Sequence, residues 1–168
     1  MQLTKGVEQA ICIIVILSTQ DKNVPLSSNE ISKRLEVSPS YLKKIIRKLV
    51  VKEIITSVPG NNGGLSLAKS TDKIKNLEII EAMEGPIKMF PDTGLIEKAF
   101  KDGECAEKGM DVLRHMFSQA DALLMEFFSR QTVADLLKES FGKTDIPTIN
   151  WNSESLSELI VKRKGEKE

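Results

Sequence analysis

Four cationic side chains are concentrated in one short stretch of the chain, and their spacing suits contact with a polyanion. Neither Asp nor Glu occurs between Glu36 and Glu53. Within this interval, apolar residues recur at the spacing of one buried helix face, namely Leu42, Ile45, Ile46 and Leu49. The outer face then carries Ser40, Tyr41, Lys43, Lys44, Arg47 and Lys48. Such cations can neutralise phosphates and bond guanine edges of DNA, whereas the alternative is a merely solvated surface.

Further candidate contacts flank this basic stretch. A turn-forming cluster at residues 59–64 contains two asparagines whose amides can bond minor-groove acceptors, and its glycines permit a close approach to a duplex. The alternative is an ordinary tight hairpin. The complete predicted contact set is Lys5, Ser28, Ser38, Ser40, Tyr41, Lys43, Lys44, Arg47, Lys48, Asn61 and Asn62.

The two cysteines, Cys12 and Cys105, are the candidates for thiol chemistry. Two cysteines cannot make the disulfide framework of a small secreted domain, which favours a reducing cytosol. Cys12 lies in an apolar run and is expected to be a small buried hydrophobe. Cys105 is expected in the first turn of a long helix, where the positive helix end favours the thiolate. Cys105 is therefore the predicted sensor of oxidants or quinone-type electrophiles, and the alternative is an unreactive thiol.

Other kinds of chemistry find little support in the residues. The chain has one histidine and lacks a nucleophile elbow, a phosphate-binding glycine loop and zinc-ligand spacing. Glu104 and Glu107 are close in sequence, but at an exposed helix start they are expected to interact with the helix dipole. Glu8 and His115 could join Cys105 as unusual ligands, but their spacing gives no metal signature. We therefore expect no enzyme, no metal site and no cofactor.

The elements that must position the basic stretch follow one another in a familiar order. A helix is predicted over residues 4–18, and Ser27 with Glu30 forms a capping-box pattern at the start of a short second helix. After a tight turn, Ser38 can cap a third helix over residues 39–51. The β-prone runs that follow are residues 54–58 and 65–68. The predicted fold class is mainly α with a small β-hairpin wing, a winged helix-turn-helix.

The second half of the chain is dominated by one long amphipathic helix, predicted over residues 106–129. Its apolar residues recur at alternating spacings of three and four, namely Met110, Leu113, Phe117, Ala120, Leu124 and Phe127. A heptad stripe on a helix of this length predicts a homodimer interface, and the alternative is packing within its own domain. Thr132, with Asp135 at the third helical position, can cap a short closing helix.

These elements predict a division of the chain into four parts. They are a winged helix-turn-helix DNA-binding domain over residues 1–85, a sensor or linker segment over 86–105, dimerisation and closing helices over 106–141, and a polar, flexible tail over 142–168. The sensor segment is apolar enough to pack against a protein partner or a small aromatic effector, although it could equally be plain core. A winged helix used only for protein contact is a further alternative.

The charges are distributed unevenly along a chain whose formal net charge is zero. Residues 1–75 carry 12 Lys and Arg against 6 Asp and Glu, and the remainder carries 12 against 18. A basic half attracts nucleic acid, whereas an acidic half suits protein contacts or small ligands. The apolar run at residues 10–17 is far shorter than the ~20 residues of a membrane span. We therefore expect a cytoplasmic protein without a membrane contact.

Several blocks occur in a characteristic order, namely residues 3–6, 27–40 with Leu42, Gly60 with 63–68, 77–85 and 132–137. Together they resemble the Rrf2 family of bacterial winged-helix transcription regulators, which includes the iron-sulfur-cluster regulator and nitric-oxide-sensitive repressors. The resemblance covers roughly residues 1–140. It implies a homodimer held by the long helix, two winged helices that read a pseudo-palindromic double-stranded DNA operator, and repression as the mode of regulation.

Two features depart from the family pattern. Pro59 and Leu65 stand where many relatives carry a basic and an aromatic residue, so the wing is expected to contribute less to minor-groove reading. Relatives that bind a cluster place three cysteines in the sensor segment, whereas this chain has Cys105 alone, at the position of the last. An iron-sulfur cluster then lacks ligands, since thiolates usually supply four. The resemblance therefore implies sensing by a single thiol or by an unknown ligand.

Overall fold

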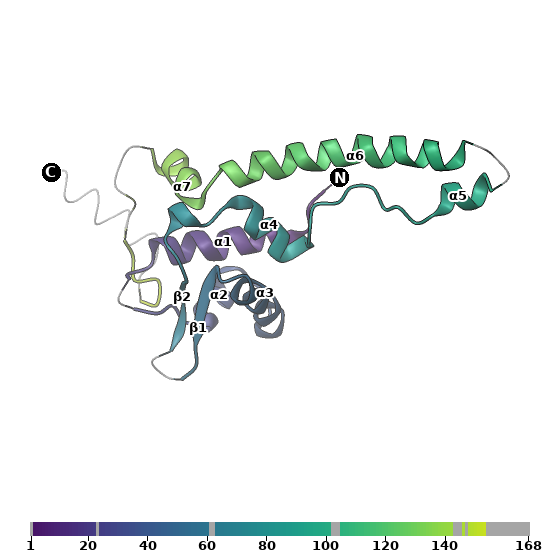
Figure 1. The fold of residues 1–168 in the computed structure, drawn as a ribbon. Coiled ribbons are helices and arrows are strands. Elements are labelled where there is room, and N and C mark those ends of the chain that lie inside the picture. Colours follow the sequence, from purple (N-terminus) through teal and green to yellow (C-terminus); the bar gives the residue numbers. More distant parts are fainter. Residues whose placement is uncertain are drawn as a thin grey trace.

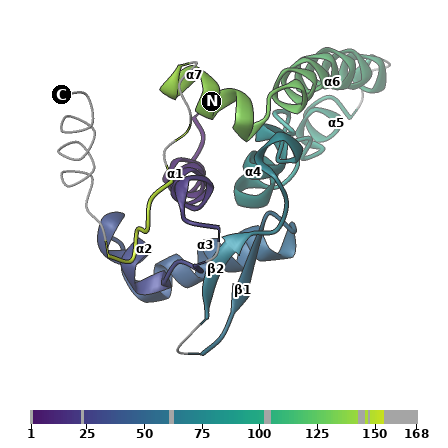
Figure 2. The same ribbon diagram turned by 90° about the vertical axis from the view of Figure 1, so that its left-hand side faces the viewer.

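The computed structural model describes residues 2–22, 24–60, 63–101, 105–142, 146 and 148–153. Helix α1 (Lys5–Thr19) runs through the middle of the fold, with the other helices and the wing arranged around it (Figure 2). Its buried apolar residues recur at spacings of three and four, as one helix face requires, and are Val7, Ala10, Ile13, Ile14 and Leu17. The central helix predicted over residues 4–18 is confirmed to within one residue at each end.

The helix-turn-helix consists of α2 (Ser28–Arg34) and α3 (Pro39–Val51). The hydroxyl of Ser27 caps α2 by accepting a hydrogen bond from the backbone N–H of Asn29 at 3.3 Å. Between the helices, Glu36 adopts a positive φ of 52°, which turns the chain sharply. The two capped helices and the turn between them are as predicted. Glu30, expected to complete a capping box with Ser27, pairs instead with Lys33 and Arg34.

The wing is an antiparallel hairpin of β1 (Ile55–Val58) and β2 (Gly64–Leu67), in which Ile55 pairs with Leu67. Close backbone packing requires glycine at positions 63 and 64. A Cβ at Gly63 would lie 2.1 Å from the carbonyl oxygen of Val58, and one at Gly64 would lie 2.7 Å from that of Leu26. The close approach at Gly64 lets Leu26 and Leu65 exchange backbone hydrogen bonds of 2.8 and 2.9 Å, which tie the wing to the segment before α2.

A short 3-10 helix, η1 (Thr71–Lys73), leads from the wing into α4 (Asn76–Glu84). The Lys69 ammonium group donates to the Glu78 carboxylate at 2.6 Å and so links the end of the wing to α4. Burial disfavours the charged form of Glu78, but the bonds from Lys69 and from the backbone N–H of Lys75 outweigh it and lower the pKa of Glu78. The wing and α4 are therefore held together by a carboxylate that stays ionised at neutral pH.

Helix α6 (Ala106–Arg130) extends well beyond the winged helix-turn-helix, and the short helix α5 (Leu95–Ala99) lies beside its far end (Figure 1). Within the described chain, α6 packs against α4, against α5 and against the segment that joins them. Much of its length therefore stands clear of the protomer's own core. Among the described residues, no helix is long and apolar enough to cross a membrane.

Helix α7 (Val133–Phe141) closes the fold above α1. Thr132 caps it as predicted, because its hydroxyl accepts from the Asp135 backbone N–H at 3.2 Å and donates to the Asp135 carboxylate at 2.6 Å. These hydrogen bonds hold the pKa of Asp135 below its usual value. Val133 and Leu137 enter the same core as α1, so the closing helix packs on the amino-terminal half of the chain.

The segment after α7 differs from the predicted flexible tail. Ile149 and Trp151 are buried and belong to the main hydrophobic core. Ile149 also forms a parallel bridge with Gln20 at the end of α1. Sequence periodicity could not reveal this segment, because its two core residues stand among polar neighbours and form no helical or strand pattern. Residues 148–153 are therefore part of the folded structure, while 154–168 lie outside the described residues.

Candidate DNA-binding and sensor surfaces

Helix α3 separates a buried face from an exposed basic face. Leu42, Ile45 and Leu49 are buried, whereas the predicted contact residues of this helix are all exposed: Ser40, Tyr41, Lys43, Lys44, Arg47 and Lys48. Ser40, Lys44 and Arg47 are spaced at i, i+4 and i+7, which places them on the side opposite the core. Within the described part of the chain, neither Lys43, Lys44 nor Arg47 forms an ion pair. Their charges remain available for an external anion.

Lys48 is engaged differently from the other three cations. Its ammonium group donates to the backbone carbonyl of Met83, near the end of α4, at 2.7 Å. The last carbonyl groups of a helix lack intrahelical partners and attract cations. Lys48 therefore serves as a link between α3 and α4, a role that its place in a basic run does not reveal.

The serines at the two helix starts have structural roles of their own. The Ser38 hydroxyl accepts from the Tyr41 backbone N–H at 3.3 Å and lies 3.2 Å from the Ser40 hydroxyl, so it caps α3. Ser28 is exposed in the first turn of α2, and Lys5 is exposed at the first position of α1. Asn61 and Asn62 lie outside the described residues.

Cys105 occupies the N-cap position of α6 and is exposed. It lies one position before the predicted first turn, and its backbone carbonyl accepts from the Gly109 N–H at 2.9 Å. Residues 102–104 lie outside the described residues. An exposed thiol at a helix start is open to reagents from solution.

Cys12 was predicted to be buried, and this is wrong: it is exposed on α1. The helix buries one face only, and Cys12 falls outside that face. Partial desolvation, followed by the negative charge of Glu8, nevertheless raises the pKa of the Cys12 thiol. A raised pKa keeps this thiol protonated at neutral pH and poorly nucleophilic.

The segment between α4 and α5 is fastened to α6 by three contacts that sequence reasoning missed. Phe90 stacks on Phe117 with ring centroids 5.0 Å apart, and the backbone N–H of Met89 donates to the Asp121 carboxylate at 3.0 Å. The Arg114 guanidinium contacts the Asp92 carboxylate at 2.8 Å. Pairs this far apart in sequence leave no periodic signal, so the sequence offered no direct sign of them.

Arg114 is the centre of an acidic cluster at this end of α6. Besides Asp92, it contacts Glu97 and Asp111, each at 3.3 Å. The hydrogen bond from Arg114 lowers the pKa of Asp92, and the pKa of Arg114 is raised in turn. Arg114 therefore joins α5 and the preceding segment to α6 through charges that persist at neutral pH.

The predicted dimer stripe on α6 is partly covered by the protomer itself. Met110 is only 1% exposed, which removes it from the surface open to a partner, and Phe117 is half-buried beneath Phe90. Leu113, Ala120 and Leu124 are also half-buried, whereas Phe127 is exposed. A second apolar row lies open to solvent and consists of Val112, Met116, Leu123 and Phe127. We call these four residues the α6 stripe.

The described residues contain no group of three or more His, Cys, Asp or Glu side chains that could hold a metal ion. The unusual ligands considered from the sequence are on separate elements: Glu8 is on α1, while His115 is on α6 and lies 3.0 Å from the Gln119 amide. Neither Glu8 nor His115 therefore lies in the same helix turn as Cys105.

A cavity of about 510 Å³ opens between the end of α1, strand β2 and α7. Its volume is in the range of small-molecule sites, ~300–1,000 Å³. Its wall combines leucines with hydroxyl groups and two lysines. The lining residues that come from β2 and the segment after it are Leu65, Ser66, Leu67, Lys69, Ser70 and Thr71. No pattern in the sequence predicts this cavity, because its walls come from distant segments.

Comparison with known proteins places this geometry in a family. Residues 3–139 match the model of the Rrf2 family, described as an iron-dependent transcriptional regulator. The HTH-type transcriptional regulator YffB of Lactococcus lactis is 33% identical over 140 residues, covering 83% of this chain and 89% of YffB. NsrR of Oceanobacillus iheyensis is 22% identical, covering 82% of this chain and 90% of that protein.

Solved structures agree on the fold. CymR of Bacillus subtilis, the global cysteine regulator, superposes with a TM-score of 0.61 at 23% identity, covering 86% of this chain and 99% of CymR. A transcriptional regulator from Lactobacillus plantarum gives 0.64 at 16% identity, covering 97% of this chain and 98% of its own. The winged-helix fold and the family resemblance predicted from the sequence are confirmed, and the relatives are regulators rather than enzymes. The chain therefore belongs to the Rrf2 family of transcriptional regulators.

Proposed function

We propose that the chain is a homodimeric repressor that inserts α3 into the major groove of a pseudo-palindromic operator. The observation that carries this proposal is the outward row of Ser40, Lys44 and Arg47, whose cations have no partner within the described protomer. A helix with this arrangement can bring a guanidinium group to guanine edges while a neighbouring ammonium group neutralises phosphate.

The double variant K44A/R47A tests this proposal against a matched control. The control, K98A/K138A, also removes two positive charges, but from exposed positions on α5 and α7. We expect K44A/R47A to weaken binding to a selected duplex by about 10- to 100-fold. The slope of the logarithm of the binding constant against the logarithm of the salt concentration should become less steep by about 0.9 for each lost phosphate contact. Equal losses in the two variants, measured by fluorescence anisotropy over a range of salt, would show that α3 has no special role.

Two protomers are joined, in this proposal, through the α6 stripe. Its residues are apolar and strongly exposed, with Val112 61% and Leu123 68% accessible in the single chain. Exposed apolar rows of this kind on a long helix are covered in stable proteins by a second surface. A homodimer would cover both stripes at once and set the spacing of the two α3 helices.

The family model carries an iron-dependent description, but the donors of this chain do not fit an iron-sulfur cluster. The chain has two cysteines, and the structure puts Cys12 on α1 and Cys105 at the start of α6. A cluster is ordinarily held by four thiolates or by two with two histidines, and the chain has one histidine. The donor set of this chain therefore does not support regulation by an iron-sulfur cluster.

We propose instead that Cys105 senses oxidants or electrophiles. Its exposure at the start of α6 supports this, because modification there would act on the helix that joins the protomers. Operator release by a quinone or by peroxide should disappear in C105S and persist in C12S. Release that continues unchanged in C105S would exclude thiol sensing at this position.

A second candidate signal is a small ligand in the cavity beside the wing. The cavity joins β2 to α7, so an occupant would contact both the DNA-binding half and the closing helix. If a ligand in this cavity is the signal, a metabolite mixture should release DNA from C105S as it does from the unmodified chain. Substitution of Ile146, an exposed residue at the cavity wall, by Trp should then weaken the response by narrowing the cavity.

A further inference from the structure

Residues 148–153 run back from α7 to the helix-turn-helix and make a series of specific contacts there. Ile149 is hydrogen-bonded to both sides of the α1 end: its N–H donates to the Thr19 carbonyl at 2.8 Å, and its carbonyl accepts from the Asp21 N–H at 2.9 Å. We call residues 148–153 the carboxy-terminal strap. It lies beyond residue 139, where the match to the family model ends.

Trp151 anchors the strap on two buried polar side chains. Its indole N–H donates to the Thr19 hydroxyl at 2.9 Å, and its backbone N–H donates to the Gln20 side-chain oxygen at 3.0 Å. Thr19 and Gln20 are themselves buried, and Trp151 is only 7% exposed. Buried polar groups of this kind stabilise one arrangement, because loss of a partner leaves a desolvated acceptor.

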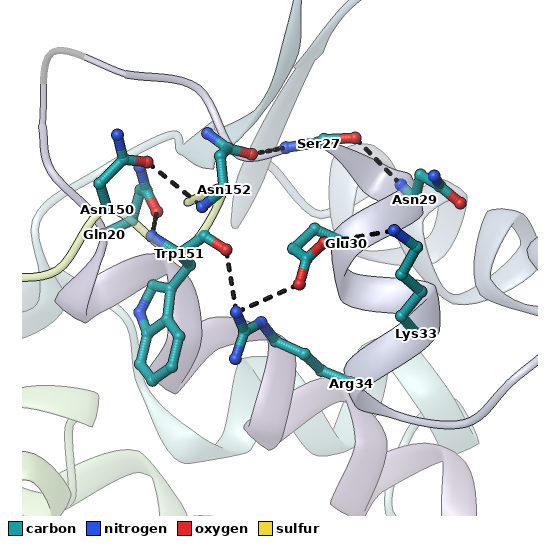
Figure 3. Close-up of polar contacts among 9 residues, drawn as sticks. All are labelled: Gln20, Ser27, Asn29, Glu30, Lys33, Arg34, Asn150, Trp151 and Asn152. Carbon is teal, nitrogen blue, oxygen red and sulfur yellow. Dashed lines mark hydrogen bonds and ion pairs between the residues drawn. The ribbon is translucent and has the colours of Figure 1, made fainter. Parts of the chain in front are cut away.

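The strap then holds the carboxyl end of α2 (Figure 3). The Arg34 guanidinium lies 4.6 Å from the centroid of the Trp151 ring and donates to the Trp151 carbonyl at 3.0 Å. The same group pairs with Glu30 at 3.1 Å, one turn earlier in α2. One guanidinium nitrogen makes both the hydrogen bond and the ion pair, and together with the cation–π contact they orient the Arg34 side chain.

Asn152 holds the opposite end of α2. Its side-chain oxygen accepts from the Ser27 backbone N–H at 3.0 Å, and its side-chain amide donates to the Pro25 carbonyl at 3.1 Å. Ser27 is the N-cap of α2, so Asn152 binds the chain at the point where the helix begins (Figure 3). Adjacent strap residues therefore contact both ends of one helix.

Helix α2 needs such support because it has only seven residues. A helix this short has little stability of its own and takes its position from tertiary contacts. It passes that position on to α3, since the Ser32 hydroxyl donates to the Val37 carbonyl at 2.6 Å and the Val37 N–H donates to the Ser32 carbonyl at 3.1 Å.

We propose that Trp151 and Asn152 are positioning residues for DNA binding. By fixing both ends of α2, the strap orients the start of α2, where Ser28 is exposed, and through the turn it orients α3. The affinity for an operator then depends on a segment more than a hundred residues away in the sequence. This inference rests on the proposed DNA-binding function.

The test uses point variants of the full chain and a duplex recovered by selection with the unmodified protein. N152A removes the acceptor of the Ser27 N–H without emptying the core, and S153A is the matched control on the next, exposed residue. We expect N152A to weaken operator binding about fivefold, the lower end of what loss of both side-chain hydrogen bonds of Asn152 implies. Hydrogen exchange at the Ser27 amide should be faster in N152A, while S153A matches the unmodified chain in both measurements.

W151F provides a second variant that keeps an aromatic ring over Arg34 but loses the indole N–H. It should weaken operator binding more than S153A does and less than N152A does. Equal binding by N152A, W151F, S153A and the unmodified chain would overturn this inference alone, as would unchanged exchange at Ser27 in N152A. If the unmodified chain selects no duplex, the proposed function fails, and this inference fails with it.

Discussion

At the scale of single residues, the basic run on α3 divides into cations with different partners. Lys44 and Arg47 face solvent, whereas Lys48 donates to the Met83 carbonyl at the end of α4. The sequence alone does not distinguish Lys48 from Lys44 and Arg47. Their roles differ because the helix turns Lys48 toward a neighbour that the sequence places far away.

The contrast between Lys44 and Lys48 is a testable prediction. K48A should lower the free energy of unfolding by about 1 kcal/mol, because the Met83 carbonyl loses its donor. K44A should leave stability unchanged and weaken duplex binding. Chemical denaturation and anisotropy on both variants check this, and the reverse pattern would show that the roles of Lys44 and Lys48 have been exchanged.

Asp92 and Arg114 give a prediction for pH. The pKa of Asp92 is lowered by the hydrogen bond from Arg114, so this contact stabilises the fold above the ordinary pKa of an aspartate, ~3.9, and is lost as the pH falls through the lowered value. The Arg114 Nε–H resonance should move in that acid range and not at neutral pH. D92N should reduce the movement to the part that Glu97 and Asp111 contribute; a transition near neutral pH would contradict the assignment.

At the scale of elements, α6 shows what periodicity can and cannot predict. The spacing correctly gave a long amphipathic helix, but apolar residues occupy more than one face of it. The predicted row includes Met110, which its own protomer buries, and Phe117, which Phe90 covers. Which row stays open depends on the segment before α5, whose course the sequence did not predict. Only Phe127 belongs both to the predicted row and to the α6 stripe.

The proposed dimer contact through the α6 stripe gives a prediction for a charge substitution. L123K places a charge in the middle of the stripe and should convert a dimer into a monomer, because an unpaired charge is costly in an apolar interface. S118K adds the same charge on an exposed position on the other side of α6 and should remain dimeric. Sedimentation of both variants checks this; identical behaviour would place the interface elsewhere.

The strap predicts the outcome of two truncations. A chain that ends after Ser153 keeps the strap contacts described above and serves as the reference. A chain that ends after Ile146 loses Trp151 and the partners of Thr19 and Gln20, and should unfold at a lower temperature. Thermal melts of both decide, and equal melting temperatures would contradict the packing of residues 148–153.

At the scale of the whole molecule, local signals predicted most of the fold. Caps at Ser27, Ser38 and Thr132 were readable because a capping side chain bonds a backbone within three residues. The contacts of Trp151 with α1, of Lys48 with α4 and of Arg114 with Asp92 were not readable, because each joins residues far apart in the chain. The basic face was thus predictable, and the contacts that orient it were not.

The charge distribution divides the chain into a basic and an acidic half. The basic half contains α3 and the wing, and the acidic half contains α6, so a duplex would be attracted to one part of the protomer and repelled by the other. This polarity supports an orientation in which α3 faces DNA while α6 joins the protomers away from it.

Selection of duplexes from a genomic pool tests the central claim most directly. The unmodified chain should enrich a pseudo-palindromic sequence with two half-sites about one helical turn apart, as two α3 helices in successive major grooves require. R47A should enrich a less specific set, because a guanidinium group no longer reaches base edges. The account is contradicted if the unmodified chain enriches no sequence, or if R47A recovers the same sequences with the same strength.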